Sequence, residues 1–170
     1  MKAKLIVEGK EFPIEILDPE LQELLEPTKT KETGYERLSK GHLYGLVGSD
    51  GKVISQLDDN DPLHDARYKT GNYYSSEEVA KNNARADQLM RQLRRFAVEH
   101  RKEKLNWSDY DQHKYTIEFD CSDGTFSVDY WVSVREFGNL FFDSQETAQL
   151  AIDTFRDELI WYFTEYKDSL

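Results

Sequence analysis

Residues 114–134 read KYTIEFDCSDGTFSVDYWVSV and predict a β-hairpin. Apolar residues alternate with polar ones on both sides of Asp123-Gly124, which is the pattern of two half-buried strands. An Asp-Gly pair between such runs is a strong hairpin signal, because the favoured two-residue turns need positive φ at both central positions. We therefore expect an antiparallel hairpin that turns at Ser122-Asp123-Gly124.

The same plan occurs earlier in the chain, where HLYGLV and KVISQL flank Ser49-Asp50-Gly51. Each hairpin is followed by Gly-Asn, aromatic residues and a helix start, at residues 71–78 and 138–146. Two pairs have the N-cap and N3 spacing of a capping box, Ser75 with Glu78 and Asp143 with Glu146, and the second copy is one residue longer before its cap. The pattern predicts two diverged β-hairpin-strand-α-helix units, residues 42–104 and 113–170.

The N-terminal region differs from these units. Residues 1–26 predict a β-hairpin followed by a short helix that begins at Asp18, and residues 27–41 are polar and predict a connector. The expected fold class is therefore α+β: an N-terminal β-hairpin and short helix, then a main body over residues 42–170 that contains the two related units.

The charge of the chain is strongly acidic, with 22 basic against 33 acidic residues and a net charge of −11. Binding to free nucleic acid is not expected, because such binding is driven by clustered Lys and Arg. The charge is uneven, however. Residues 77–104 contain eight basic and five acidic residues, a net charge of +3, which leaves −14 for the remainder.

Cysteine content and apolar runs bear on the compartment. Cys121 is the single cysteine, so an intramolecular disulfide is excluded, and Cys and His are not clustered at zinc-site spacing. The sequence has no signal-peptide pattern at its start and no apolar run long enough for a transmembrane helix. These features predict a cytoplasmic protein that does not act at a membrane.

The residues that could carry chemistry are few. The best metal-like group is the acidic segment with Asp58, Asp61 and His64, because hard cations prefer carboxylate oxygens; the alternative is a solvated acidic loop. Cys121 is flanked by Asp120 and Asp123, which disfavour a thiolate nucleophile. Without a Walker loop, a G-x-G-x-x-G or an H-E-x-x-H motif, the sequence predicts neither an enzyme nor a cofactor.

Two groups of residues are candidates for binding. Arg91, Arg94, Arg95 and Arg101 lie on or near one side of a predicted long helix, and could hold an acidic partner, a phosphate ligand or nucleic acid, or pair with the chain's own acids. Trp161 and Tyr162 are surplus to one apolar helix face, and could pack on the N-terminal hairpin or form an intermolecular surface.

The two Gly-Asn-aromatic-cap motifs, the run Leu93-Arg94-Arg95-Phe96-Ala97 and the ending Trp161-Tyr162-Phe163 resemble small uncharacterised accessory proteins of phages and prophages of Gram-positive bacteria. The resemblance covers most residues from Tyr35 onward. It implies a genetic setting, the cytoplasm of the host cell, and transfers no catalytic residue. Small acidic phage proteins often bind host machinery, including defence systems.

The leading hypothesis is a non-enzymatic protein that binds a host protein or protein complex and inhibits or modulates it, for example as an anti-defence, anti-CRISPR-like protein. An alternative is a small-ligand or nucleotide-binding, sponge-like protein that uses Arg91, Arg94 and Arg95 with aromatic stacking. A third is an enzyme with an unfamiliar site near Asp61 and His64. An oligomer is compatible with each.

Overall fold

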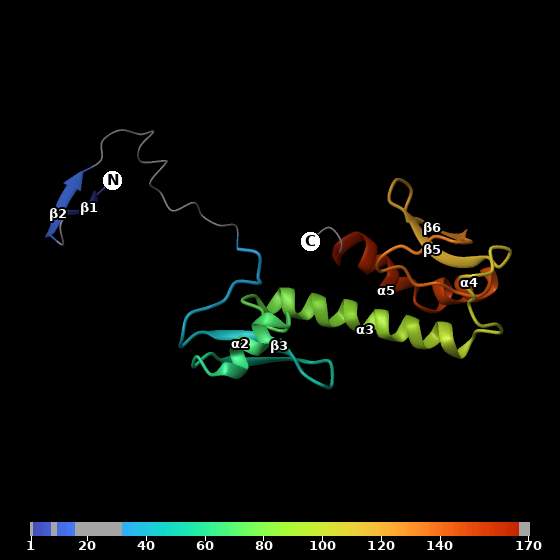
Figure 1. Ribbon diagram of the computed structural model, residues 1–170, viewed down its shortest axis with the longest axis horizontal. Coiled ribbons are helices and arrows are strands. Elements are labelled where there is room, and N and C mark those ends of the chain that lie inside the picture. The colour runs from blue at the N-terminus through green and yellow to red at the C-terminus, as the bar shows by residue number, and fades with distance from the viewer. Residues whose placement is uncertain (1, 8–9, 16–31, 167–170) are drawn as a thin grey trace.

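The computed structural model describes residues 2–7, 10–15 and 32–166, and it is a mixed structure of helices and small antiparallel hairpins (Figure 1). This confirms the α+β class. Strands β1 (Lys2–Val7) and β2 (Lys10–Glu15) pair with each other. The helix expected from Asp18 lies outside the described residues.

The two predicted hairpins of the main body are present. Strand β3 (Leu43–Val47) pairs antiparallel with β4 (Val53–Leu57), and β5 (Lys114–Asp120) pairs with β6 (Thr125–Trp131). Both turns fall at the predicted Ser-Asp-Gly positions, in loops that span residues 48–52 and 121–124. The expectation of positive φ at both central residues is wrong, because Gly51 and Gly124 have positive φ whereas Asp50 and Asp123 do not. Longer hairpin loops need a single left-handed residue, which glycine supplies without strain.

Between the first hairpin and Gly71 lies a helix that the sequence pattern did not predict, α2 (Pro62–Lys69). Its local signals are clear once the helix is known. The Asp61 side chain accepts a hydrogen bond from the amide of Leu63, and Pro62 occupies the first turn, where its missing N–H costs nothing. The segment expected to be a polar loop is therefore partly helical.

The long helix α3 (Glu77–Glu99) and the later helix α4 (Gln145–Thr154) have N-caps one residue later than predicted. Their N-caps are Ser76 and Ser144, whose hydroxyls accept from the third residue of each helix. Ser75 and Asp143 were predicted for this role and have other partners. The Ser75 hydroxyl donates to Glu36, and Asp143 accepts from the amides of Lys102 and Glu103.

Helical periodicity near the C-terminus predicts one apolar stripe, which the structure divides among three segments; its residues are Ala148, Ile152, Phe155, Leu159, Phe163 and Tyr166. After α4 the chain leaves helical geometry at Phe155, where φ is −112° and ψ is 20°, and continues as α5 (Arg156–Trp161) and a π-helical turn η1 (Tyr162–Tyr166). This break redirects the last aromatic residues, so the stripe does not form one straight helical face.

Helix α3 is the centre of the main body. The first hairpin and α2 lie on one side of its N-terminal half, whereas β5, β6, α4 and α5 lie on the opposite side (Figure 1). Ala80 is fully buried against the first hairpin, where a side chain at Gly45 would stand 3.1 Å from its Cβ. Leu93 and Ala97 belong instead to the core of the C-terminal part. The helix therefore buries different faces along its length.

Two isolated bridges extend the hairpins. Tyr74 pairs with Gly45 of β3, and Phe142 pairs with Tyr115 of β5, each two residues before a serine cap. Within the described part of the chain, no helix is long and apolar enough to cross a membrane.

Candidate functional site

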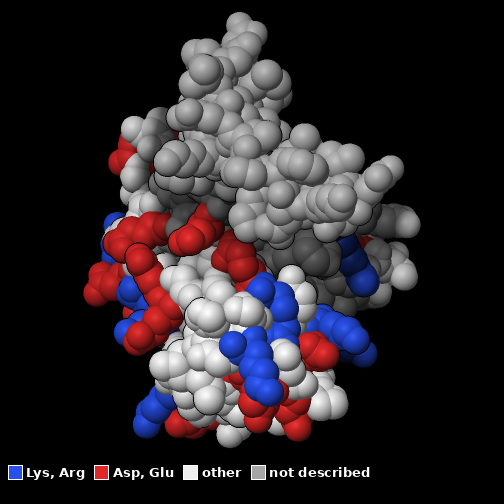
Figure 2. Space-filling view, turned by 90° about the vertical axis from the view of Figure 1, so that its left-hand side faces the viewer, with Lys and Arg blue, Asp and Glu red and all other residues white. Residues whose placement is uncertain are grey.

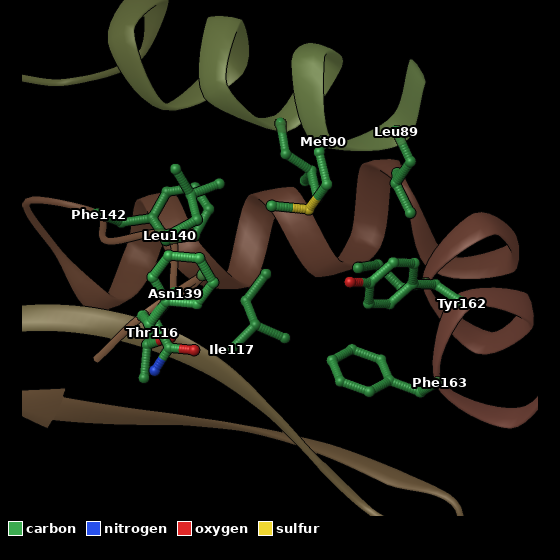
Figure 3. A pocket seen from close by; sticks show the side chains of 13 residues that line it. Leu89, Met90, Thr116, Ile117, Asn139, Leu140, Phe142, Tyr162 and Phe163 are labelled. Carbon is green, nitrogen blue, oxygen red and sulfur yellow. The ribbon is translucent and has the colours of Figure 1, made fainter. Parts of the chain in front are cut away.

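An apolar cleft of about 400 Å³ lies between α3, β5, the loop before α4 and the C-terminal helices. Helix α3 contributes Leu89, Met90 and Leu93 from one side, and Ile117 reaches in from β5 (Figure 3). The other lining residues are Thr116, Phe137, Gly138, Asn139, Leu140, Phe142, Leu159, Tyr162 and Phe163. We call this feature the aromatic cleft.

The aromatic cleft is lined without a charged side chain. Its polar groups are Thr116, Asn139 and the hydroxyl of Tyr162, which can orient a ligand, while the apolar walls supply contact area. Phe137 stands at the edge of the cleft with its side chain fully exposed. Because Phe137 adjoins the apolar lining, the two form one contiguous apolar surface, and such surfaces are typical of sites that bind a partner.

The structure separates the two predicted C-terminal candidates. Tyr162 lines the aromatic cleft, and its ring packs edge-on against Phe163. Trp161 is 7% exposed, and the guanidinium of Arg85 lies 3.9 Å above its ring. Arg85 of α3 therefore covers the ring of Trp161, and the indole does not form part of an exposed surface.

The structure also divides the four candidate arginines. Arg91 and Arg95 share a shallow groove on α3 with Gln88 and Gln92. Arg94 and Arg101 are exposed but do not line this groove. Of the four candidate arginines, Arg91 and Arg95 therefore lie next to each other in this groove, one helical turn apart.

The three weak metal candidates have structural partners in or beside the first hairpin and α2. Asp58 is fully buried, pairs with Arg37 and accepts from the Tyr73 hydroxyl at 2.8 Å. Asp61 caps α2, and His64 is buried between two partners. Within residues 32–166, no group of three or more His, Cys, Asp or Glu is arranged to hold a metal ion.

The histidine of this group has an arrangement that resembles a catalytic relay. Its Nε2 lies 2.8 Å from Asp59 and its Nδ1 lies 2.7 Å from the hydroxyl of Tyr44. The Asp61 amide and the His64 ring hold the pKa of Asp59 below its usual value. Tyr44, however, is 2% exposed, and its oxygen already accepts from Arg67 at 2.6 Å. The hydroxyl therefore has no access to a substrate and serves the packing of α2 on β3.

Surface charge is mixed around this first hairpin. Figure 2 views the molecule from the left-hand side of Figure 1, and acidic side chains gather along one side of the described surface, with basic side chains interspersed. The fields of neighbouring charges of opposite sign partly cancel, so this face does not have an electrostatic potential of one sign over its whole area.

No family model, no curated protein and no solved structure matches this chain.

The sequence reasoning missed most of the aromatic cleft. Nothing in the sequence distinguishes Met90, Leu93 and Phe142 from ordinary core residues, and Phe137 is not part of a recognisable motif. The one available signal was the position of Phe137 immediately before Gly138, whose φ of 86° turns the chain. A large apolar residue beside a turn is a candidate for exposure, because loops lie on the surface.

Proposed function

We propose that this protein is a non-enzymatic, phage-encoded protein that binds a host protein through the aromatic cleft and thereby inhibits or modulates it, as an anti-defence protein would. The carrying observation is the aromatic cleft with the exposed Phe137 at its edge. Aromatic residues and methionine are enriched at the centres of protein interfaces, where charged residues are depleted. The resemblance to phage accessory proteins supports the host setting and a cytoplasmic location.

The expected mode of binding is insertion of an apolar side chain of the partner between α3 and the C-terminal helices. Phe142 and Leu159 form a fixed floor, because they are 1% and 3% exposed. Met90 is only partly buried, and its unbranched thioether can adapt to the inserted group. Phe137 would then close over the partner, so it should contribute a large share of the affinity.

The test compares three full-length proteins as immobilised baits in host lysate. Phe137→Ser removes the exposed ring from the cleft, and Tyr110→Ser removes an exposed ring, 67% accessible, that does not line the cleft. We expect one host protein to be retained by the unchanged protein and by Tyr110→Ser, and lost with Phe137→Ser. Expression of the same three proteins in cells challenged with phage should change plating efficiency in the same order. Equal capture by all three would contradict the role of the cleft.

A second candidate function is binding of a small molecule, because a volume of about 400 Å³ falls within the usual range of ligand pockets. The ligand would be uncharged and apolar. A nucleotide fits less well, because Arg91 and Arg95 each lie two residues from Leu93 and so project from the opposite side of α3. Thermal-shift screening with nucleotides and neutral aromatic compounds separates these ligands from a protein partner.

The architecture supports a related proposal, that residues 42–104 and 113–170 are diverged copies of one hairpin-strand-helix unit joined to an N-terminal hairpin by a connector. Each copy has an antiparallel hairpin and, after it, an aromatic residue that forms a bridge to the first strand of that hairpin. A serine cap follows the aromatic residue by two positions. Helix α2 is then an insertion in the first copy. The test is to superpose the backbones of the two copies. If the hairpin strands or the bridge residues did not align, the duplication would be contradicted.

A further inference from the structure

The lower side of α3, as drawn in Figure 1, changes character along the helix. Its first half carries Ala80 and Ala84, which are 0% and 6% exposed, and Ala80 packs against the first hairpin at Gly45. Steps of three and four residues continue the same helical face through Gln88, Arg91, Gln92 and Arg95. We call these four residues the Gln/Arg face.

The Gln/Arg face is open to solvent where the first hairpin no longer covers α3. The side chains of Arg91 and Arg95 are 56% and 72% exposed, and together with the two glutamines they line a shallow groove. Four long side chains that end in planar hydrogen-bonding groups thus follow one another along two turns of helix. Such groups suit carboxylate oxygens, which accept two parallel hydrogen bonds from a guanidinium.

The acids among the described residues engage these arginines poorly. The nearest approaches are 4.0 Å between Arg91 Nη1 and Asp87 and 3.7 Å between Arg95 Nε and Glu99. Both exceed hydrogen-bond distance, so most of the guanidinium donors are not taken up by these acids. Arg85 differs, because it donates to both carboxylate oxygens of Glu158 at 2.8 and 3.1 Å.

We propose that the Gln/Arg face binds an acidic helical segment of a protein, with two carboxylates of the segment placed four residues apart. The spacing is complementary: residues four apart on any α-helix are separated by about 6 Å along the axis, so two partner glutamates match Arg91 and Arg95. Gln88 and Gln92 can donate to the same carboxylates from either side. A helix laid along α3 also fits an open, shallow groove.

Other anions fit this face less well. A nucleic acid would bring many phosphates close to a chain that carries −14 outside residues 77–104, so long-range repulsion opposes it. A compact phosphate needs donors that converge on one point, whereas Arg91 and Arg95 are arranged along an exposed helix surface. The proposal rests on the proposed function only in taking the partner to be a protein, and it concerns the side of α3 opposite the aromatic cleft.

The test is fluorescence anisotropy of the full-length chain with a fluorescein-labelled synthetic helical peptide that carries glutamates four residues apart on one face. We expect saturable binding that Arg91→Gln/Arg95→Gln weakens at least tenfold. The matched control is Lys52→Gln/Lys69→Gln, which removes the same charge from exposed positions elsewhere and should change the affinity less than twofold. Glutamine is a good helix former, so circular dichroism should show α3 intact in the arginine variant.

Several outcomes would overturn the proposal. A control peptide carries the same glutamates scattered around the helix. Equal binding of this peptide would show that bulk charge drives the association and would refute the spacing argument. Binding of pyrophosphate or of a single-stranded oligonucleotide without binding of the peptide would refute the acidic-segment assignment. Phe137→Ser should bind the peptide normally, which separates this test from that of the cleft.

Discussion

Arg85 should stabilise the packing of α5 on α3 through two contacts, and Arg85→Ala measures their sum. The guanidinium lies 3.9 Å above the ring of Trp161 and donates two hydrogen bonds to Glu158. A cation–π contact contributes about 0.5–2 kcal/mol, and Trp161 is 7% exposed, which favours the upper part of that range. The ion pair is 44% and 42% exposed, so it adds about 0.2–1 kcal/mol.

We therefore expect Arg85→Ala to lower the free energy of unfolding by about 1–3 kcal/mol, which corresponds to about 3–9 °C in Tm for a chain of this size. Urea unfolding followed by Trp fluorescence measures the change. Lys81→Ala is the control, because Lys81 pairs with Glu77 at 2.7 Å on the same helix but both side chains are more than 60% exposed, and less than about 0.5 kcal/mol is expected. Arg85→Met keeps the side-chain stem without the charge. If Arg85→Met is as stable as the unchanged protein, the charge-based reasoning is refuted.

Three further predictions concern titration and packing. Hydrogen bonds from Ser75 and Thr33 lower the pKa of Glu36 to about 2, so its contribution to stability, complete above the ordinary pKa of 4.5, is lost as pH falls toward 2; the difference in unfolding free energy between the unchanged protein and Glu36→Gln should shrink over that range. Burial raises the pKa of Tyr74 to about 12, so above pH 10 the unfolded chain loses this proton first and alkali favours unfolding; Tyr74→Phe should remove the highest step of an ultraviolet titration. Phe142 is 1% exposed in the C-terminal core, and Phe142→Ala should cost about 3–5 kcal/mol in urea unfolding, whereas a loss below 1 kcal/mol would contradict its place in the core.

The local elements followed from local patterns. The second hairpin turns at Ser122-Asp123-Gly124 as predicted, and the aromatic residues before each helix lead to a cap. The caps were misplaced by one residue because Ser75-Ser76 and Asp143-Ser144 each offer two capping side chains, and the choice depends on distant partners. Glu36 takes the Ser75 hydroxyl, and the amides of Lys102 and Glu103 take Asp143.

The candidate sites were less predictable from the sequence than the local elements. The prediction that Arg91 and Arg95 share a surface is consistent with their common groove, since their spacing of one turn is local information. The role of Asp58 could not be read in the same way. An acid in a polar, charge-rich segment predicts exposure, but Arg37 and Tyr73, 21 and 15 residues away, bury and satisfy this carboxylate.

The amino-acid sequence by itself determined the hairpins, the long helix and the concentration of basic residues on it, because alternation, helical periodicity and turn residues act over a few positions. Only the tertiary structure decided that Trp161 is covered by Arg85 and that Tyr162, its neighbour, lines a cleft with Leu93 and Phe142. Those partners lie on separate elements far apart in the chain. Burial and access depend on which surfaces meet, so they are properties of the assembled fold.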